Sequence, residues 1–262
     1  MANIEAGAAL LAEARLNLAR MEALPDAARP RTAEEAYACQ DLLVDRLRAH
    51  YGGELIGYKI ACTNKLAQDL LHMPGPFHGK MFSAHSVESP GRLRAADFFM
   101  RVMEAEFAFR MARDLPAGGG PFTREQVADA VEGVLPGIET VDSRFTSWTT
   151  VGGPSLIADN ACHGAWVKGV LVRNWRGIDL AAQRVELLVN GAVIQRGSGA
   201  AVLGHPLNAL EWLANDLSAR GTGLKAGQYI TTGVTTDIYL AERGDRVEAD
   251  FGPVGRVEVQ WE

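Results

Sequence analysis

The chain has 262 residues, of which 47% are hydrophobic and 22% are charged, a composition typical of a globular protein with ample material for a core. Its formal net charge is −6 and no basic cluster is present, which argues against nucleic acid or an anionic membrane as a partner. No apolar run approaches the roughly 20 residues that span a bilayer, and three cysteines without paired spacing fit free thiols in a reducing cytoplasm.

The first third of the chain has helical periodicity. Apolar residues at helical spacing predict one helix before Pro25 and a second helix that begins at Thr32. Glu35 stands three residues after Thr32, which is the pattern of a capping box. A shorter helix is expected to begin at Asn64, with an extended segment before it.

The chain from about residue 92 onward is rich in strand signals. The clearest is the stretch RVELLVNGAVIQRG, whose two apolar runs are joined by Asn190-Gly191, a dipeptide that suits a type I′ hairpin. Two helices interrupt the strands, one over residues 123–131 and one from Pro206 to Gly221. A terminal pair of strands is expected around Gly252-Pro253.

These elements predict an α+β protein without regular βαβ alternation. We expect a helical N-terminal region over residues 1–80 packed on a strand-rich mixed β-roll over residues 81–262, together forming one structural unit.

The stretch RVMEAEFAFR places two glutamates one residue apart in an otherwise apolar run. Because side chains alternate along a strand, Glu104 and Glu106 point to the same face. One interpretation is an edge strand with one wet face; the other is half of a divalent-metal site, since paired carboxylates repel unless a cation or a shared proton relieves them. Glu139, in PGIETVDSR, is a third glutamate in an apolar segment, and three carboxylates suit Mg²⁺ or Mn²⁺. The opposite face of the first strand is expected to enter the core with Met103, Ala105, Phe107 and Phe109.

Several common motifs are missing. The stretch GSGAAVLG has Val202 where a dinucleotide-binding loop needs its third glycine, and it lacks the ending of a Walker A loop. No Cys-x-x-Cys pair, His-Glu-x-x-His motif or Gly-x-Ser-x-Gly elbow occurs. The six histidines do not cluster in the sequence, and a lone histidine is more often structural than catalytic.

Six segments carry a resemblance to a known family: GYKIACTNK, EAEFAF, PGIETVDSRF, IADNACHGAWVKG, GSGAAVLGHPLNALEWLAN and GLKAGQYITTGVTT. In their order and spacing they resemble the fumarylacetoacetate hydrolase superfamily, and within it the branch of 2-oxopent-4-enoate hydratases and 4-oxalocrotonate decarboxylases. The resemblance runs through nearly the whole chain and implies the family's fold, a C-terminal-like β-roll.

The resemblance implies that Glu104, Glu106 and Glu139 hold one divalent cation, Mg²⁺ or Mn²⁺, which favours the metal site over the wet strand. It also implies a catalytic role for Lys59, which would bind a carboxylate or move a proton. The alternative for Lys59 is a stem lying along the surface.

Four further residues match pocket segments of the family and are expected to bind substrate: Asn160, Cys162, Arg144 and Thr232. For Asn160 a purely backbone role in a turn is an alternative. Arg144 would either clamp a substrate carboxylate or pair only with Asp142.

The chain departs from the family pattern at two places. Hydratases of the family usually read Pro-Asp-aromatic-Gly where this chain has Pro76-Phe77-His78-Gly79, so a pocket aspartate is absent. His78 is the nearest substitute general base; the alternative is that it faces solvent while Phe77 closes an apolar pocket suited to decarboxylation. Cys162 stands where many relatives carry serine, which replaces a hydroxyl donor with a weaker thiol donor.

The expected function is therefore that of a metal-dependent hydratase that adds water to a 2-hydroxy-2,4-dienoate in aromatic meta-cleavage catabolism. One alternative is a decarboxylase of a 2-oxo-3-enedioate of the 4-oxalocrotonate type, and another is a non-catalytic binding member of the fold. The expected partner is a small 2-oxo acid, in a homo-oligomeric, cytoplasmic protein.

Overall fold

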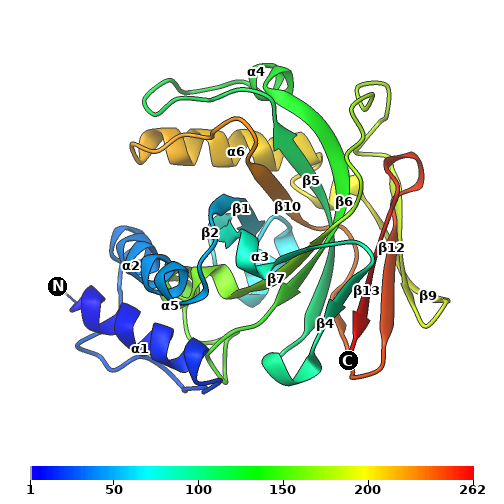
Figure 1. The fold of residues 1–262 in the computed structure, drawn as a ribbon. Coiled ribbons are helices and arrows are strands. Elements are labelled where there is room, and N and C mark those ends of the chain that lie inside the picture. The colour runs from blue at the N-terminus through cyan, green and yellow to red at the C-terminus, as the bar shows by residue number, and fades with distance from the viewer. Residues whose placement is uncertain (1) are drawn as a thin grey trace.

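Two β-sheets and six α-helices make up the computed structural model, which describes residues 2–262 (Figure 1). The larger sheet has the strand order β2-β1-β10-β5-β6-β7-β3, with β11 paired to β5, and the smaller has the order β4-β13-β12-β8-β9. Figure 1 shows α1, α2 and α5 side by side at one end of the large sheet, with the five-stranded sheet on the opposite side. No helix in this part of the chain is long and apolar enough to cross a membrane.

The elements have the following bounds. The helices are α1 (Ile4–Leu16), α2 (Ala33–Tyr51), α3 (Lys65–Leu70), α4 (Arg124–Asp129), α5 (Gly153–Ala158) and α6 (Pro206–Ala219). The strands of the large sheet are β1 (Leu55–Ala61), β2 (Phe77–Phe82), β3 (Ser86–Glu88), β5 (Val102–Met111), β6 (Val131–Val141), β7 (His163–Lys168), β10 (Tyr229–Val234) and β11 (Tyr239–Leu240). Those of the small sheet are β4 (Gly91–Leu93), β8 (Arg184–Val189), β9 (Ala192–Ser198), β12 (Arg246–Asp250) and β13 (Arg256–Trp261).

Local signals place these elements where the sequence predicts them. The Thr32 hydroxyl accepts a hydrogen bond from the Glu35 N–H at 3.2 Å and so caps α2. Asn190 and Gly191 have φ of 52° and 85°, the positive values that a type I′ turn needs between β8 and β9. The predicted α+β class and terminal strand pair, β12 with β13, are confirmed.

The first 80 residues contribute strands as well as helices to the fold. β1 pairs in parallel with β10, and β2 pairs with β1, so both belong to the large sheet. The boundary expected at residue 80 therefore lies inside β2, and the helical part of this region is confined to α1, α2 and α3.

Strand β5 lies in the interior of the large sheet, between β10 and β6, which rules out the edge-strand interpretation. Its core-facing side chains are those expected, and all are fully buried: Met103, Ala105, Phe107 and Phe109. The opposite face of β5 carries the two glutamates. Residues directly opposite each other in an antiparallel pair of strands share a face, so the register between β5 and its neighbours determines which side chains lie beside these glutamates.

Candidate metal centre and active-site cavity

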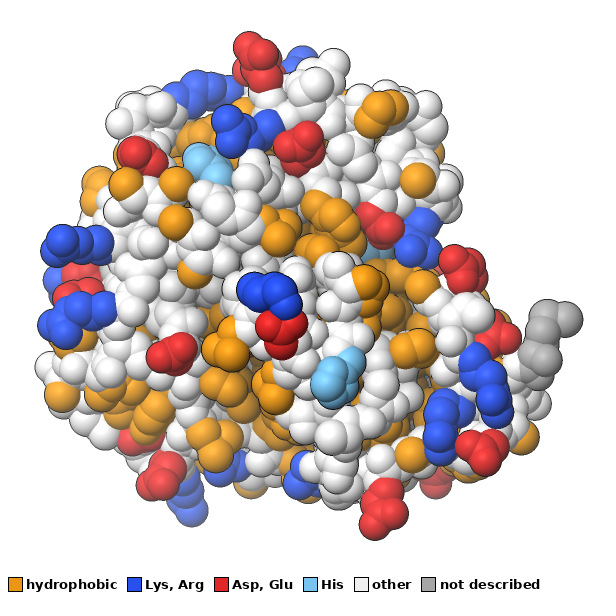
Figure 2. All heavy atoms as spheres, turned by 180° about the vertical axis from the view of Figure 1, so that it is seen from behind, with side chains coloured by type: hydrophobic (Ala, Val, Ile, Leu, Met, Phe, Trp, Pro, Cys, Tyr) orange, Lys and Arg blue, Asp and Glu red, His pale blue; other side chains and the backbone are white. Residues whose placement is uncertain are grey.

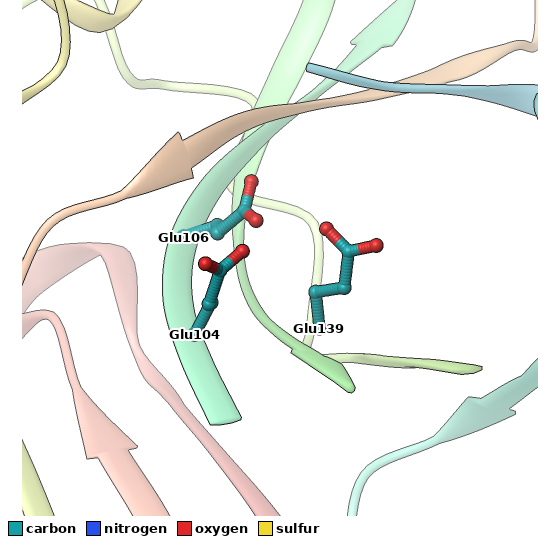
Figure 3. Close-up of side chains that lie close together, drawn as sticks. All are labelled: Glu104, Glu106 and Glu139. Atoms are coloured by element: carbon teal, nitrogen blue, oxygen red, sulfur yellow. The ribbon is translucent and has the colours of Figure 1, made fainter. Parts of the chain in front are cut away.

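Three glutamates meet on one face of the large sheet. Glu104 and Glu106 come from β5, and the register of the β5–β6 pair sets Glu139 directly opposite Glu104. One carboxylate oxygen from each residue lies within 4.8 Å of those of the other two, and Figure 3 shows the three carboxylates gathered in one space between the strands.

The three carboxylates have different hydrogen-bond partners. Glu106 accepts from the Gly233 N–H through Oε2 at 2.5 Å, while its Oε1 is buried and has no partner among residues 2–262. Glu139 Oε1 lies 2.9 Å from Nδ1 of His163, and its Oε2 lies 3.2 Å from Nζ of Lys59. Only Glu104 is partly exposed, so the cluster opens through this residue.

Burial and mutual repulsion oppose ionisation of two of these groups. Burial raises the pKa of Glu104 to about 7, and burial with the charges of Glu139 and Glu104 raises the pKa of Glu106 well above its ordinary value. Burial also disfavours the Glu139 carboxylate, but Lys59 and His163 outweigh it and lower its pKa. The surrounding protein thus stabilises the ionised form of only one of the three carboxylates, that of Glu139.

The cluster fits a hard divalent cation. Its donor set consists of oxygen atoms only, which is what Mg²⁺, Mn²⁺ and Ca²⁺ prefer. The partnerless Oε1 of Glu106 and the unrelieved charge of Glu104 are the features that a cation would satisfy. Glu104, Glu106 and Glu139 are the residues that would hold it.

Lys59 lies beside the glutamates and away from the surface, with 2% of its side chain exposed. Strand alternation in β1 sends Tyr58 and Ile60 to the core and Lys59 to the opposite face. Its ammonium group donates to the Ala161 carbonyl at 3.0 Å and pairs with Glu139. Burial disfavours the ammonium form, but the neighbouring glutamates outweigh it and raise the pKa of Lys59, so the group stays protonated.

A cavity of about 950 Å³ adjoins the cluster. Lys59, Glu104 and Cys162 belong to its polar end, and apolar side chains form much of its wall, among them Leu66, Leu70, Phe77, Trp148 and Ile238. Residues of the small sheet also line it, among them Arg184 and Arg196. Such a space, apolar with a few convergent polar groups, suits a small organic acid.

Two of the predicted substrate-binding residues, Asn160 and Thr232, form side-chain hydrogen bonds to backbone groups. The Asn160 side-chain amide binds the backbone of Lys80 twice. Its oxygen accepts from the Lys80 N–H at 2.7 Å, and its NH₂ group donates to the Lys80 carbonyl at 2.8 Å. The Thr232 hydroxyl donates to the Phe107 carbonyl at 2.9 Å. Neither side chain lines the cavity.

Cys162 does line the cavity, as expected for a substrate contact. Its thiol is buried, and burial raises its pKa to about 12, so the thiol stays neutral and can act only as a weak donor.

Arg144 pairs with Asp142 and stacks over the Phe99 ring, with 4.9 Å between its Cζ and the ring centroid. It lines a separate cavity of about 450 Å³ and not the one beside the glutamates. Of the two roles open to Arg144, the structure shows the pairing with Asp142.

His78 lies away from the glutamates. Its partner across the β1–β2 ladder is Ile60, so it points to the face opposite Lys59. Its ring stacks on Tyr37 at 4.4 Å, and its Nε2 lies 3.3 Å from the Asp216 carboxylate of α6. His78 is buried and not solvent-facing, and Phe77 takes the place expected in the apolar wall of the cavity. The geometry gives His78 no access to the cavity, which removes the basis for its expected role as a substitute base.

His163 and Thr63 are the residues of the site that the sequence did not single out. His163 contacts Glu139 from β7, and Thr63 follows β1 on the cavity wall. Their only sequence signal is their place within the segments IADNACHGAWVKG and GYKIACTNK. The contact between His163 and Glu139 is not local in sequence, and periodicity does not reveal which residues line a cavity.

The fold and the site define a β-roll protein with a three-carboxylate centre at the end of a small-molecule cavity. A family model described as Fumarylacetoacetate (FAA) hydrolase C-terminal matches residues 71–260, and the chain belongs to this family, as the resemblance predicted.

Similar proteins include two kinds of lyase. A 2-hydroxyhexa-2,4-dienoate hydratase of Comamonas testosteroni is 36% identical over 232 residues, covering 88% of this chain and 86% of the relative. A 4-oxalocrotonate decarboxylase of Pseudomonas putida is 30% identical over 230 residues, covering 88% and 86%. The solved structure of the 4-oxalocrotonate decarboxylase from Pseudomonas putida G7, complexed with magnesium and adipate, matches with a TM-score of 0.91 and 27% identity over 99% of this chain and 97% of that one. A second structure of that enzyme is complexed with calcium and acetate.

Proposed function

We propose that the chain is a divalent-metal-dependent lyase that adds water to a 2-hydroxy-2,4-dienoate. The observation that carries the proposal is the convergence of Glu104, Glu106, Glu139 and Lys59 beside a cavity whose wall is in large part apolar. Hydratases named for such dienoates among the relatives support the substrate class. The convergence of all four groups also favours an enzyme over a non-catalytic member of the fold.

A cation held by Glu104, Glu106 and Glu139 would supply Lewis acidity toward a bound 2-oxo acid. The chain's own residues do the rest. Two acceptors, the Ala161 carbonyl and Glu139, hold the ammonium group of Lys59, which leaves its third proton for the substrate. The apolar wall, which includes Phe77 and Leu70, receives the hydrocarbon end of the acid.

The reaction adds one water in total. The dienol loses its hydroxyl proton and gains a proton at C5, which gives a 2-oxo-3-enoate; water oxygen then bonds to C4 and a proton adds to C3. Lys59, held protonated by its neighbours, is the group placed to donate and recover a proton at the cavity floor.

Decarboxylation of a 2-oxo-3-enedioate is the second candidate. One observation favours it: Arg184 lies on the cavity wall, and no salt bridge or side-chain hydrogen bond to its guanidinium occurs within residues 2–262. A free guanidinium at that place suits a second carboxylate. Similarity to the decarboxylase of Pseudomonas putida points the same way.

Product analysis separates the two reactions. Purified protein with Mg²⁺ is given 2-hydroxypenta-2,4-dienoate or 4-oxalocrotonate, and the hydrated acid and released CO₂ are measured. We expect water addition to the dienoate to have the higher kcat/KM. Release of CO₂ far in excess of hydration would instead establish the decarboxylase, and the absence of both reactions would contradict the proposal.

We further propose a cytoplasmic, homo-oligomeric enzyme. Cys39, Cys62 and Cys162 are all free and buried, which suits a reducing compartment. Figure 2 shows hydrophobic side chains exposed in several groups on one face of the molecule, and large apolar residues such as Val170 and Leu240 are exposed, which supports contact with another copy. Sedimentation analysis of the purified protein tests the second point.

A further inference from the structure

Thr63 has a buried hydroxyl without a partner beside the catalytic groups. It follows β1, is 1% exposed, and lines the cavity that also reaches Lys59 and Glu104. Its Oγ1 makes no hydrogen bond with any of residues 2–262. Buried hydroxyls are nearly always hydrogen-bonded in folded proteins, so one left open on a cavity wall indicates a ligand or an ordered water as its partner.

The local structure fixes this hydroxyl in place. The Thr63 carbonyl accepts from the Leu203 N–H at 2.9 Å, which ties the backbone to the loop before α6. On one side Cys62 takes a positive φ of 63°, and on the other Asn64 caps α3 by accepting from the Ala67 N–H at 2.8 Å. Threonine is also stiff at χ1, since two heavy atoms branch from its Cβ. Little conformational entropy is therefore lost when the hydroxyl binds a ligand.

Gly233 allows the hydroxyl to approach the metal centre closely. A Cβ at position 233 would lie 1.9 Å from Thr63 Oγ1, and the residue has a φ of 99°. The N–H of this glycine is the donor to Glu106. Thr63 Oγ1 and a Glu106 oxygen thus flank the same glycine, one at its α-carbon and the other at its amide.

We propose that Thr63 is a substrate-binding residue whose hydroxyl donates a hydrogen bond to a carboxylate oxygen of the bound 2-oxo acid. The ligand must be an anion, because the groups that await it at this end of the cavity are the Lys59 ammonium and a cation held by the glutamates. Beside an anionic oxygen a hydroxyl acts as donor. The identity of the acid rests on the proposed function, but the hydroxyl–carboxylate contact does not.

The test uses oxalate, the smallest anion with the vicinal oxygens of a 2-oxo acid, titrated by calorimetry into Mg²⁺-loaded protein. Thr63→Val keeps the shape and deletes the hydroxyl, and we expect oxalate to bind about 10- to 100-fold more weakly, the range for a lost hydrogen bond to a charged group. Thr63→Ser should bind oxalate within about threefold of the wild type.

Thr140→Val is the matched control. Its hydroxyl is also buried and without a partner, but Thr140 lies opposite Met103 and Ala165, whose side chains belong to the core, so it points away from the glutamates. We expect Thr140→Val to bind oxalate as the wild type does. The Mg²⁺ affinity without oxalate and the melting temperature should stay unchanged in Thr63→Val, and Thr63→Ala serves if the valine variant does not fold.

Three results would overturn the inference. Wild-type affinity of Thr63→Val for oxalate would show that the hydroxyl binds only water, and an equal loss of Mg²⁺ affinity would show that it acts on Glu106 through Gly233. If Thr63→Val turns over the dienoate with unchanged kcat/KM, Thr63 does not bind the substrate, and the proposed function is still supported. If Thr63→Val binds oxalate more weakly but the wild type turns over neither acid, the Thr63 site is supported and the proposed function is wrong.

Discussion

Glu104, Glu106 and Glu139 share one buried site although each carboxylate opposes the charge of the others. Burial raises the pKa of the first two, so the metal-free protein holds protons that a bound cation must displace. Hydrogen bonds do not remove this conflict, since Glu106 Oε1 has no partner among the described residues. At the scale of residues the site is therefore destabilised without its metal, as binding sites often are.

Replacement of Glu106 by glutamine should separate metal binding from stability. Glu106→Gln removes one ligand charge, and we expect the Mg²⁺ affinity to fall by about 100-fold or more and turnover to fall with it. In chelator the variant should melt at or above the temperature of the wild type, because the amide is neutral without the proton that Glu106 must bind in this buried cluster. Calorimetric Mg²⁺ titration and thermal melts measure both, and wild-type Mg²⁺ affinity would contradict the assignment.

Lys59 should matter for stability as well as for turnover. Lys59→Met deletes the ammonium that faces Glu139, and we expect kcat/KM to fall by roughly 100-fold or more. The unfolding free energy should fall by about 3–5 kcal/mol, the usual cost of breaking a buried ion pair. Adding Glu139→Gln should restore part of the stability and none of the activity. Unchanged kcat/KM in folded Lys59→Met would remove Lys59 from the mechanism.

Strand alternation alone placed Glu104 and Glu106 on one face, since side chains two apart in a strand always share a face. Glu139 was noted as a third glutamate in an apolar segment, but its assignment to the same site depended on the family resemblance, because the register between β5 and β6 cannot be inferred from either segment. For the same reason the contact of His163 with Glu139 was missed. Arg144 remained open between two roles until tertiary structure supplied its neighbours.

Helix α6 and strand β2 meet at a polar contact within an aromatic cluster. His78 of β2 packs on Tyr37 and faces Asp216 of α6, which also pairs with Arg220 at 2.7 Å. Burial lowers the pKa of His78, and the contact with Asp216 opposes this only in part. At the scale of elements, His78 connects β2 to α6 and does not line the cavity beside the glutamates.

His78→Phe should change the pH dependence of stability and leave turnover within about threefold of the wild type. The native His78 has a lowered pKa, so below its ordinary value near 6.5 the unfolded chain takes up a proton that the folded chain does not. Stability therefore falls as the pH drops through that value, and His78→Phe should lessen the fall in melting temperature between about pH 7.5 and pH 5.5.

The control is His50→Gln, at an exposed position near the end of α2, which should leave kcat/KM unchanged. A drop in kcat/KM of roughly 100-fold in folded His78→Phe would restore the sequence-based prediction of a catalytic base.

Elements with strong local signals were predictable, and their pairing was not. The β8–β9 hairpin follows from its Asn-Gly turn, and α2 from its cap at Thr32. The parallel pairing of β1 with β10 joins segments about 170 residues apart, and no local pattern encodes it. For this reason the division expected at residue 80 did not anticipate that β1 and β2 enter the large sheet.

The two sheets have different parts in the cavity when the molecule is viewed whole. The large sheet supplies Lys59 and the glutamates at the polar end, and the small sheet supplies Arg184 and Arg196 on the wall. Of these two arginines, Arg196 pairs with Glu186 at 2.8 Å, whereas Arg184 has no salt bridge within residues 2–262. An acid with carboxylates at both ends offers the Arg184 guanidinium a second anionic group, which a monoacid lacks.

Arg184→Met should therefore act on one substrate class. For a 2-oxo-enedioate we expect kcat/KM to fall about fivefold, the upper value for one ion pair at an exposed arginine, and to lose its dependence on salt. For a dienoate monoacid kcat/KM should stay within about twofold, because the hydrocarbon end makes no use of the guanidinium. Arg113→Met, at an exposed arginine outside the cavity, is the matched control and should alter neither. An equal fall in kcat/KM for both acids would mean that Arg184 has a structural role in the cavity wall. An unchanged kcat/KM for both would show that Arg184 does not contact the second carboxylate of the substrate.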